Sequence, residues 1–517
     1  MASAAATAGP APLKGARLGV IAFALALGTF MMVLDTTIAN VSLPTIAGNL
    51  GVSSDNSTWV ITAFAVANGV FVPLTGWLMG RFGVVKTFCV AVVMFTLASL
   101  LCGLAWSLPS LILFRIFQGA VAGPMMPGSQ ALLLMIFPPE KRSTALGIWS
   151  ITALVGPVLG PILGGYISDN YHWSWIFLIN VPVGIFTALV CWGGLKDRDT
   201  PTRKLPIDIV GLGLLVTWVG CLQSMLDLGK NADWFADPAI IVLAIVAVLG
   251  FVAWVIWEFT DANPAVDLSL FRYRNFWVGN VCLSLGYAVM FANLLLLPLW
   301  LQTNLGYTAT WAGLVSAPAG VVAVLLSPLA ARMGGKVDSR LLATVSFLAF
   351  AVGYYLRSEL TTAASAWEII VPQLAQGVGM SVFFLSTLTI MLDGIPPERI
   401  PSATGISNFL RITGGSFGAS IITTAWDNRE ALHQSRLSEA VANGPTMHAT
   451  IGVLMGRGMT ELQAQGAVAG QMVGQSYLLA STDLFRVSAW IALVLTGLIW
   501  LARRPASSGG AAHAAAD

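Results

Sequence analysis

Fourteen apolar runs, most of them about twenty residues long, follow one another through the sequence. A helix needs about 20 mostly apolar residues to cross a bilayer, and it satisfies its backbone polar groups internally. The runs lie near residues 17–43, 57–79, 87–105, 108–136, 143–166, 175–195, 208–227, 239–258, 275–301, 311–331, 341–357, 367–391, 402–426 and 482–502. Only 10% of the residues are charged, against about a quarter in soluble domains. We therefore expect an all-α membrane protein with fourteen transmembrane helices.

The 26 lysine and arginine residues are distributed unevenly between the two sides of these helices. With the N-terminus placed in the cytoplasm, most of them fall in inner connections, as the positive-inside rule requires, and both chain ends are then cytoplasmic. Arg357 is one of the few assigned to an outer connection. The longest outer segment, residues 427–481, is polar and contains HQSRLSEA, which favours a helix. This segment is either a solvated helical excursion or a docking surface for a partner.

Two inner connections resemble each other, PPEKRSTALG at 138–147 and PPERIPSATG at 396–405, and they are 258 residues apart. The same offset relates further residues inside the apolar runs, namely Gln118 and Gly119 to Gln376 and Gly377, Gly156 to Gly414, and Gly160 to Gly418. Several matches at one offset indicate an internal duplication. Parallel repeats of six spans are typical of transporters that bind substrate between two halves, near the middle of the bilayer.

The offset covers eight apolar runs, so one pair is surplus to a six-span repeat. We assign the surplus pair to 208–227 and 239–258, after the charged linker KDRDTPTRKLPID. The predicted organisation is a tail (1–16), a six-helix bundle (17–195), a linker with two extra helices (196–274), a second six-helix bundle (275–502) that includes the outer segment 427–481, and a tail (503–517).

Several ionisable residues fall within the apolar runs, where charges are expensive and usually functional, and two of them lie at a similar depth. Asp35 follows seventeen uncharged residues, and Arg115 lies inside the run 108–136. The helical rise places both in the outer half of the bilayer. Apolar surroundings favour the protonated acid, whereas a nearby arginine favours the ionised acid, so Asp35 could exchange a proton near neutral pH. The alternative is a static buried ion pair that fixes helix packing.

The segment GPVLGPILGG, residues 156–165, is unusually rich in glycine and proline. Gly156, Gly160 and Gly164 recur at four-residue spacing, so one helix face can approach another closely, and Gly165 adjoins it. Pro161 bends the helix. The segment therefore predicts a tight, bent interface, with or without a role in gating.

Polar side chains at other positions in the runs are candidates to line a wide, mostly apolar substrate cavity. They are Thr36, Asn40, Asn68, Gln118, Gln130, Asn293, Gln373, Gln376, Asn408 and Arg411. With the exception of Arg411, each of them more often makes a hydrogen bond between helices than a substrate contact. Arg411 is a cation deep within a run, and together with Arg115 it could favour neutral or weakly acidic lipophilic substrates.

Other classes of protein have little support. The five cysteines are isolated, the four histidines are scattered, and the net charge is only +2, so no metal site, cofactor or nucleic-acid partner is indicated. An enzyme needs clustered nucleophiles and bases, and a receptor needs a folded ligand-binding domain; the sequence shows neither signature.

Three motifs carry a resemblance to a known family. LDTTIANVSLP (34–44), RIFQG (115–119) and GPILGG (160–165) are similar to motifs of the major facilitator superfamily, specifically its fourteen-span drug:proton antiporters of the EmrB/QacA type. NYHWSWIFLINVP (170–182) and ATWAGLVSAP (309–318) extend the similarity over nearly the whole chain.

The resemblance implies a multidrug efflux pump of a bacterial inner membrane that exchanges protons for hydrophobic, drug-like substrates. Asp35 is then the proton carrier, and Arg115 modulates it. The resemblance also implies two partners, a periplasmic membrane-fusion adaptor protein and an outer-membrane channel. A proton-coupled importer of a small organic solute on the same fold is the alternative.

The chain departs from the superfamily in the connection after the second run. That connection normally carries an acid, whereas GWLMGRFGVVK has Gly80 at the position. We therefore expect closure of the inner side to use other contacts.

Overall fold

The structure is a computed structural model that describes residues 13–52, 57–202, 208–230, 232–261, 266–334, 336–442 and 446–504. Most of each predicted tail and residues 203–207 of the charged linker lie outside the described residues. The described part is helical throughout and contains no β-strand.

The first half of the molecule is built from spans that are partly broken. The second span bends by 58° between α3 and α4, where Pro73 interrupts the helix. The fifth bends by 40° within the glycine–proline segment of α8. The helices of this N-terminal half are α1 (Gly15–Leu50), α3 (Trp59–Phe71), α4 (Thr75–Phe82), α5 (Val84–Gly103), α6 (Leu108–Ala122), α7 (Met125–Ile136), α8 (Arg142–Asn170), α9 (Trp175–Leu178) and α10 (Asn180–Leu195).

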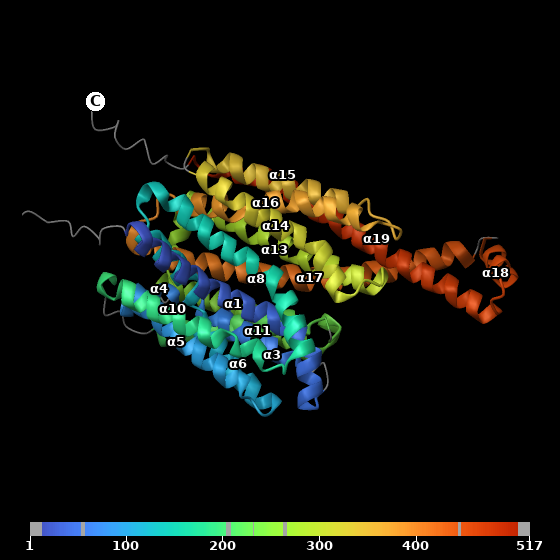
Figure 1. Cartoon of the computed structure of the whole chain (residues 1–517), viewed down its shortest axis with the longest axis horizontal. Coiled ribbons are helices and arrows are strands. Elements are labelled where there is room, and N and C mark those ends of the chain that lie inside the picture. Colours follow the sequence, from blue (N-terminus) through green and yellow to red (C-terminus); the bar gives the residue numbers. More distant parts are fainter. Residues whose placement is uncertain are drawn as a thin grey trace, which may run out of the picture.

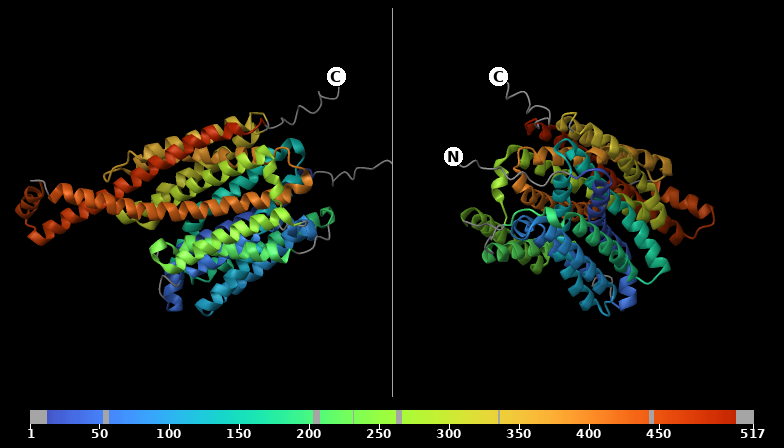
Figure 2. Two further views of the ribbon diagram at one scale, coloured as in Figure 1. Left: turned by 180° about the vertical axis from the view of Figure 1, so that it is seen from behind. Right: turned by 60° about the vertical axis from the view of Figure 1, so that its left-hand side comes forward.

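The second half repeats this arrangement with fewer breaks in its helices. They are α13 (Arg274–Asn304), α14 (Ala309–Met333), α15 (Ser339–Arg357), α16 (Ala366–Leu392), α17 (Ile400–Ala442), α18 (Thr446–Gly456) and α19 (Glu461–Leu498). The packing matches as well: α1 lies against α8 and α10, and α13 lies against α17 and α19. Figures 1 and 2 show the halves as two bundles beside each other.

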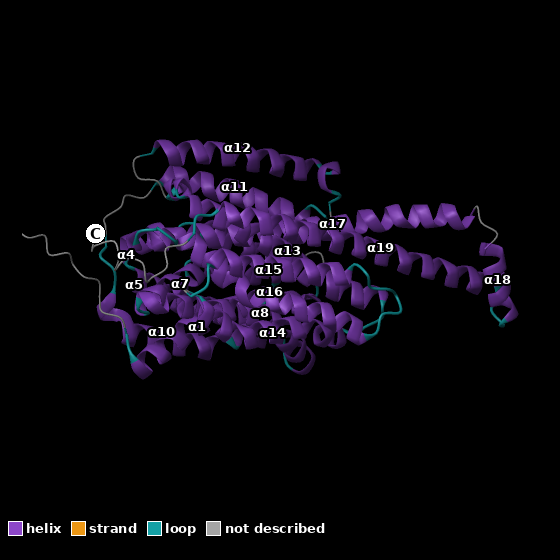
Figure 3. Cartoon of the chain, turned by 90° about the horizontal axis from the view of Figure 1, so that it is seen from above, coloured by secondary structure: helices purple, strands orange, loops and turns teal. Residues whose placement is uncertain are grey.

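The surplus pair forms α11 (Ile209–Leu228) and α12 (Pro238–Thr260), which pack together at one edge of the molecule (Figure 3). Helix α11 contacts α3 of the N-terminal half and α17 of the C-terminal half. The pair therefore sits beside the junction of the two halves.

Eleven helices of the described chain are long and apolar enough to cross a membrane, and the two bent pairs raise the number to thirteen. The remaining predicted run, 402–426, lies in α17, which is outside that set. The total of fourteen spans and the cytoplasmic location of both ends remain predictions.

The halves meet closely at the end that carries the two repeated connections, which we call the inner end. A Cβ atom on Gly76 of α4 would lie 2.7 Å from Cα of Ser402 at the start of α17. A Cβ atom on Gly334 would lie 2.6 Å from Cβ of Ser143 at the start of α8. The repeat offset relates Gly76 to Gly334, so two equivalent contacts close this end.

The carboxylate that the inner connection lacks at Gly80 is supplied from elsewhere in the chain. Asp199, in the linker after α10, accepts hydrogen bonds from the backbone N–H groups of Val85 (2.9 Å) and Lys86 (3.1 Å) at the start of α5. Gly83, with φ of 93°, leaves room for that carboxylate. An acid at a helix N-terminus is favourable because it faces free N–H groups. This contact stays within the N-terminal half, so closure rests on the glycine contacts.

The predicted outer segment is an extension of two transmembrane helices. Helices α17 and α19 continue beyond the bundle, and α18 lies at their tip (Figures 1 and 3). The octapeptide HQSRLSEA, residues 433–440, is helical as expected. The two helices are tied together where they leave the bundle, because Trp426 stacks near Tyr477, with ring centroids 4.7 Å apart, and donates to Ser481 (2.8 Å). At the tip, a small apolar cluster holds Ile451 against α19.

Candidate functional site

The two ionisable residues predicted to lie at similar depth form an ion pair. Nη1 of Arg115, on α6, lies 2.6 Å from Oδ2 of Asp35, on α1, and both side chains are 0% exposed. Charge-assisted hydrogen bonds of this kind are short and strong. Removing either partner would strand the other as an uncompensated buried charge.

Further polar groups complete the coordination of Asp35. Its Oδ1 accepts hydrogen bonds from Gln118 Nε2 (3.0 Å) and Asn180 Nδ2 (2.8 Å). Gln118 also donates to Ser99 on α5 (2.8 Å) and accepts from Arg115 (2.7 Å). The cluster therefore joins α1, α5, α6 and α10 around one carboxylate. Each donor to Asp35 stabilises the ionised form of the acid, so protonation would weaken the bonds from Arg115, Gln118 and Asn180.

The guanidinium of Arg115 is held in place by neighbours other than the acid. Its Nε donates to the backbone oxygen of Val60 (3.0 Å), and its Cζ lies 4.2 Å from the ring centroid of Phe64. Nη2 has no hydrogen-bond partner among the described residues. A cation over an aromatic face is attracted to it, which partly offsets the missing partner.

The glycine-rich segment packs against the part of α1 that carries Asp35. A Cβ atom on Gly156 would clash with Val33, and one on Gly160 would clash with Thr37. A Cβ atom on Gly164 would lie 3.0 Å from the backbone oxygen of Ile38, so the predicted face of small residues is a helix–helix contact. Gly165 is different: a Cβ atom there meets nothing within 4 Å, so it does not belong to this face. The side chain of Pro161 lies outside those that the structure describes.

The C-terminal half contains a second buried cation, and here the sequence-based assignment was wrong. We had placed Arg357 in an outer connection, but it is the last residue of α15 and only 1% exposed. Its Nη2 donates to Gln373 Oε1 (2.5 Å) and to Gln376 Oε1. Two predicted lining residues therefore bind a buried arginine at the end of α15. Asn293, on α13, is not bonded to these residues and donates to Ser488 of α19 (2.9 Å).

A third polar group bridges the two halves. Asn408 of α17 donates to Gln130 of α7 (3.1 Å) and accepts from Arg411 (3.1 Å). Arg411 lies over the ring of Tyr287, 4.6 Å from its centroid, and is otherwise surrounded by apolar groups. The structure thus gathers three predicted residues at the contact between the halves.

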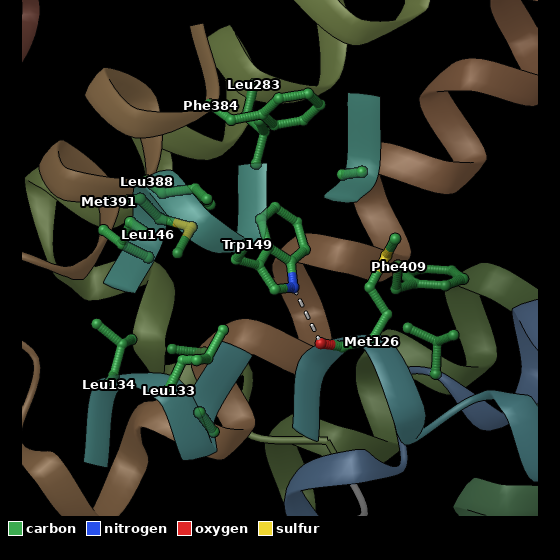
Figure 4. Close-up of a cluster of buried hydrophobic side chains, with 14 of the residues drawn as sticks. Met126, Leu133, Leu134, Leu146, Trp149, Leu283, Phe384, Leu388, Met391 and Phe409 are labelled. Carbon is green, nitrogen blue, oxygen red and sulfur yellow. Dashed lines mark hydrogen bonds between the residues drawn. The ribbon is translucent and has the colours of Figure 1, made fainter. Parts of the chain in front are cut away.

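The surroundings of this bridge are aromatic and apolar. Trp149 of α8 donates to the backbone oxygen of Met126 (3.3 Å) and meets Phe384 of α16 edge-on, with ring centroids 5.9 Å apart (Figure 4). Leu146, Leu388 and other side chains fill the space around this contact. Any compound that passes between the halves must therefore displace an apolar contact with few polar groups.

The remaining predicted lining residues are not part of these clusters. Thr36 donates to the backbone oxygen of Val33 (2.7 Å) and Asn68 to that of Gly119 (3.3 Å), so both bind backbone groups. Asn40 is exposed.

One apolar cavity of about 530 Å³ lies where α11 and α12 meet α17. Its lining includes Trp218, Phe251, Trp254, Phe259, Ile406 and Phe409. Since Phe409 also belongs to the apolar cluster between the halves, the cavity adjoins that cluster from the side.

Sequence reasoning missed Ser99, Asn180 and Arg357. Asn180 lies in a stretch already recognised as similar to the family, so its place beside a transmembrane acid could have been inferred. The repeat offset of 258 relates Ser99 to Arg357 and Asp35 to Asn293, and it would have pointed to both.

Comparison with known proteins agrees with this architecture. Residues 25–419 match the Major Facilitator Superfamily. The chain is 50% identical to the multidrug export protein EmrB of Escherichia coli (strain K12) over 96% of this chain and 98% of that protein. It is 48% identical to the fatty acid resistance protein FarB of Neisseria gonorrhoeae over 97% and 99%, respectively.

Solved structures show the same fold. The proton:xylose symporter XylE superposes with a TM-score of 0.59 at 13% identity, covering 93% of this chain and 95% of that one. A bacterial homologue of the lysosomal transporter Spinster superposes with a TM-score of 0.53 at 16% identity, covering 96% and 100%. The chain is therefore a membrane transporter, not an enzyme, and belongs to the Major Facilitator Superfamily.

Proposed function

We propose that this protein is a proton-driven exporter of hydrophobic, drug-like compounds in a bacterial inner membrane. The single observation that carries the proposal is the fully buried ion pair between Asp35 and Arg115. Ionisable groups inside a membrane usually mark ion or substrate paths. The relative named as a multidrug export protein supports the direction and breadth of transport.

Helix α8 supports a coupling route from the acid to the contact between the halves. Its outer part packs on Val33, Thr37 and Ile38, next to Asp35. Its inner part contacts the other half, because a Cβ atom on Gly147 would lie 2.9 Å from Cβ of Ala331. A shift of α8 relative to the C-terminal half would therefore also displace the segment of α1 that carries Asp35. Conversely, protonation of Asp35 weakens the links that hold that segment.

These contacts support the following alternating cycle. With Asp35 ionised, four helices of the N-terminal half are tied together and the inner end is closed. When Asp35 takes up a proton from the outer side, its pair with Arg115 is lost and α1 can shift against α8. Opening of the inner end then releases the proton to the cytoplasm and admits a substrate at the apolar contact near Arg411.

Proton flux in reconstituted vesicles tests the proposal. An imposed pH gradient should drive movement of a lipophilic dye against its own gradient, and Asp35→Asn should abolish this movement while the protein still inserts. Asp227→Asn, which removes an acid of α11 outside the cluster, should leave it intact. Gradient-driven transport by Asp35→Asn would contradict the proposal. Movement of solute and proton in the same direction would favour the importer.

We also propose that the outer extension docks a periplasmic adaptor protein, which leads to an outer-membrane channel. The supporting feature is apolar exposure at the tip of an otherwise polar segment: Leu462 is 81% exposed and Val453 57%. Exposed apolar groups that cluster commonly mark interaction sites. The competing role is a cap over the outer opening.

Two sets of variants separate these roles. Shortening the chain between Gln434 and Gln475 should abolish co-purification of the adaptor while drug transport by the pump alone in vesicles persists. Leu462→Ser combined with Val453→Ser should weaken the same co-purification, whereas Arg457→Ser, a polar change at the same tip, should not. Retained adaptor with lost transport would favour the cap.

A further inference from the structure

The internal repeat gives the Asp35 cluster a counterpart in the C-terminal half. Adding the offset of 258 takes the four residues Asp35, Ser99, Arg115 and Gln118 to Asn293, Arg357, Gln373 and Gln376, respectively. The helices correspond as well, because α5 packs against α6 as α15 packs against α16. Each half therefore has one buried arginine among the residues that the offset relates, but the C-terminal half has an amide, Asn293, where the N-terminal half has its carboxylate.

Arg357 has no carboxylate within ion-pair distance among the described residues. The nearest acid in sequence, Glu359, is more than half exposed and lies 3.6 Å from Arg486. The partners of Arg357 are the amide oxygens of Gln373 and Gln376, which carry only partial negative charge. A fully buried guanidinium is normally paired, because an isolated charge inside a protein is costly.

Several hydrogen-bond donors around Arg357 are also without partners among the described residues. They are Nε and Nη1 of Arg357, Nε2 of Gln373 and the hydroxyl of Tyr354, whose ring lies 5.6 Å from the guanidinium carbon. A guanidinium offers only donors, so both amide oxygens must face it, and the amide nitrogen of Gln373 must face a different acceptor. The cluster thus has one positive charge and a surplus of donors, which is the chemistry of an anion site.

We propose that Arg357, Gln373 and Gln376 form a binding site for one monovalent anionic group, which takes the role that Asp35 plays in the other half. The group is either a free chloride ion or the carboxylate of an amphipathic solute. Arg357 supplies the charge, and the unpartnered donors complete the coordination. The site is separate from the bridge at Arg411, which lies between the halves.

Thermal unfolding of the purified full-length protein tests the site without any transport step, so its outcome is independent of proton coupling. In the chloride arm, the unfolding temperature is compared in sodium chloride and sodium gluconate at equal ionic strength. In the solute arm, dodecanoate is compared with dodecanol in gluconate. A ligand that binds only the folded protein raises its unfolding temperature with a saturating concentration dependence.

We expect at least one anion to stabilise the wild type in this way, and Arg357→Gln to remove the effect. The matched control is Arg486→Gln, which removes an exposed arginine on the helix next to the site. This variant should still be stabilised by the anion. Stabilisation by chloride alone assigns a free anion, and stabilisation by dodecanoate but not dodecanol assigns a solute carboxylate. No specific stabilisation in either arm, or an equal effect in Arg357→Gln, overturns the proposal.

Gln373→Glu keeps the test decisive if Arg357→Gln fails to fold. This change supplies a carboxylate from within the chain while it keeps an oxygen facing Arg357. The variant should unfold at a higher temperature than the wild type in gluconate, and anions should no longer stabilise it. A lower unfolding temperature with an undiminished anion effect would contradict the assignment.

Discussion

In the N-terminal half Arg115 is held by a carboxylate, whereas in the C-terminal half Arg357 is held only by amide oxygens. Both arginines are buried, and both are among the residues that the repeat offset relates. The duplication therefore preserved buried polar residues in each half but kept a carboxylate in only one. This division suggests that one half is specialised for protons and the other for an anionic group.

The largest difference should appear when each arginine is replaced by leucine. Arg115→Leu strands the ionised Asp35, and breaking a buried pair in this way costs about 3–5 kcal/mol. Arg357→Leu removes a charge that has no acid partner. The unfolding temperature of this variant in gluconate should therefore fall much less than that of Arg115→Leu, or rise. Unfolding of both variants in the same detergent measures the contrast. Equal losses would show that Arg357 has a partner equivalent to Asp35.

A second contrast lies within the glycine-rich segment of α8. Gly160→Leu places a bulky group against Thr37, and overpacking of this kind costs about 1–3 kcal/mol. It should also stop transport, because it wedges α8 away from the segment that carries Asp35. Gly165→Leu, five residues further on, should leave transport close to normal. If both variants transported normally, the coupling route through α8 would be excluded.

The smallest effect concerns the capping of two equivalent helices. Helix α5 is capped by Asp199 from a distant linker, whereas α15 is capped by its adjacent residue Asp338. Asp199→Ala and Asp338→Ala should each cost about 1 kcal/mol. Limited proteolysis should distinguish them, because only Asp199→Ala should release the linker. Equal cleavage of the linker in both variants would contradict this reading.

The cap on α15 should also depend on pH. A hydrogen bond from Arg340 lowers the pKa of Asp338 in the folded protein. The stability that it contributes is therefore present above the ordinary pKa of an aspartate and is lost as the pH falls below about 4. Asp338→Ala should remove this part of the acid sensitivity, which an unfolding series over acidic pH measures.

The parts of the structure that follow from helical periodicity could be predicted from the sequence. The pairing of Asp35 with Arg115 follows from depth along two helices, and the contact at Gly160 follows from four-residue spacing. Both predictions rest on positions along single helices, which the local sequence determines. The duplication was also visible, because glycines and a repeated connection mark it.

Other features depend on long-range contacts that leave little trace in the sequence. Arg357 stands at the end of an apolar run, where an arginine normally reaches towards water, and only Gln373 and Gln376 turn it inward. The apolar run predicts the end of a span near residue 426 but not how far the helix itself runs: α17 continues to Ala442 and packs on α19. The capping of α5 by Asp199 could not be predicted, because the N–H groups that it binds lie more than a hundred residues away in the sequence.

The length of α17 has a mechanical consequence. It is one unbroken helix of 43 residues, from the inner glycine contact at Gly76 to the outer tip, so it spans about 64 Å at the helical rise. A tilt of about 10° at the inner contact would move the far end by roughly 11 Å along this lever. We therefore expect the outer tip to move by this distance when the inner end opens.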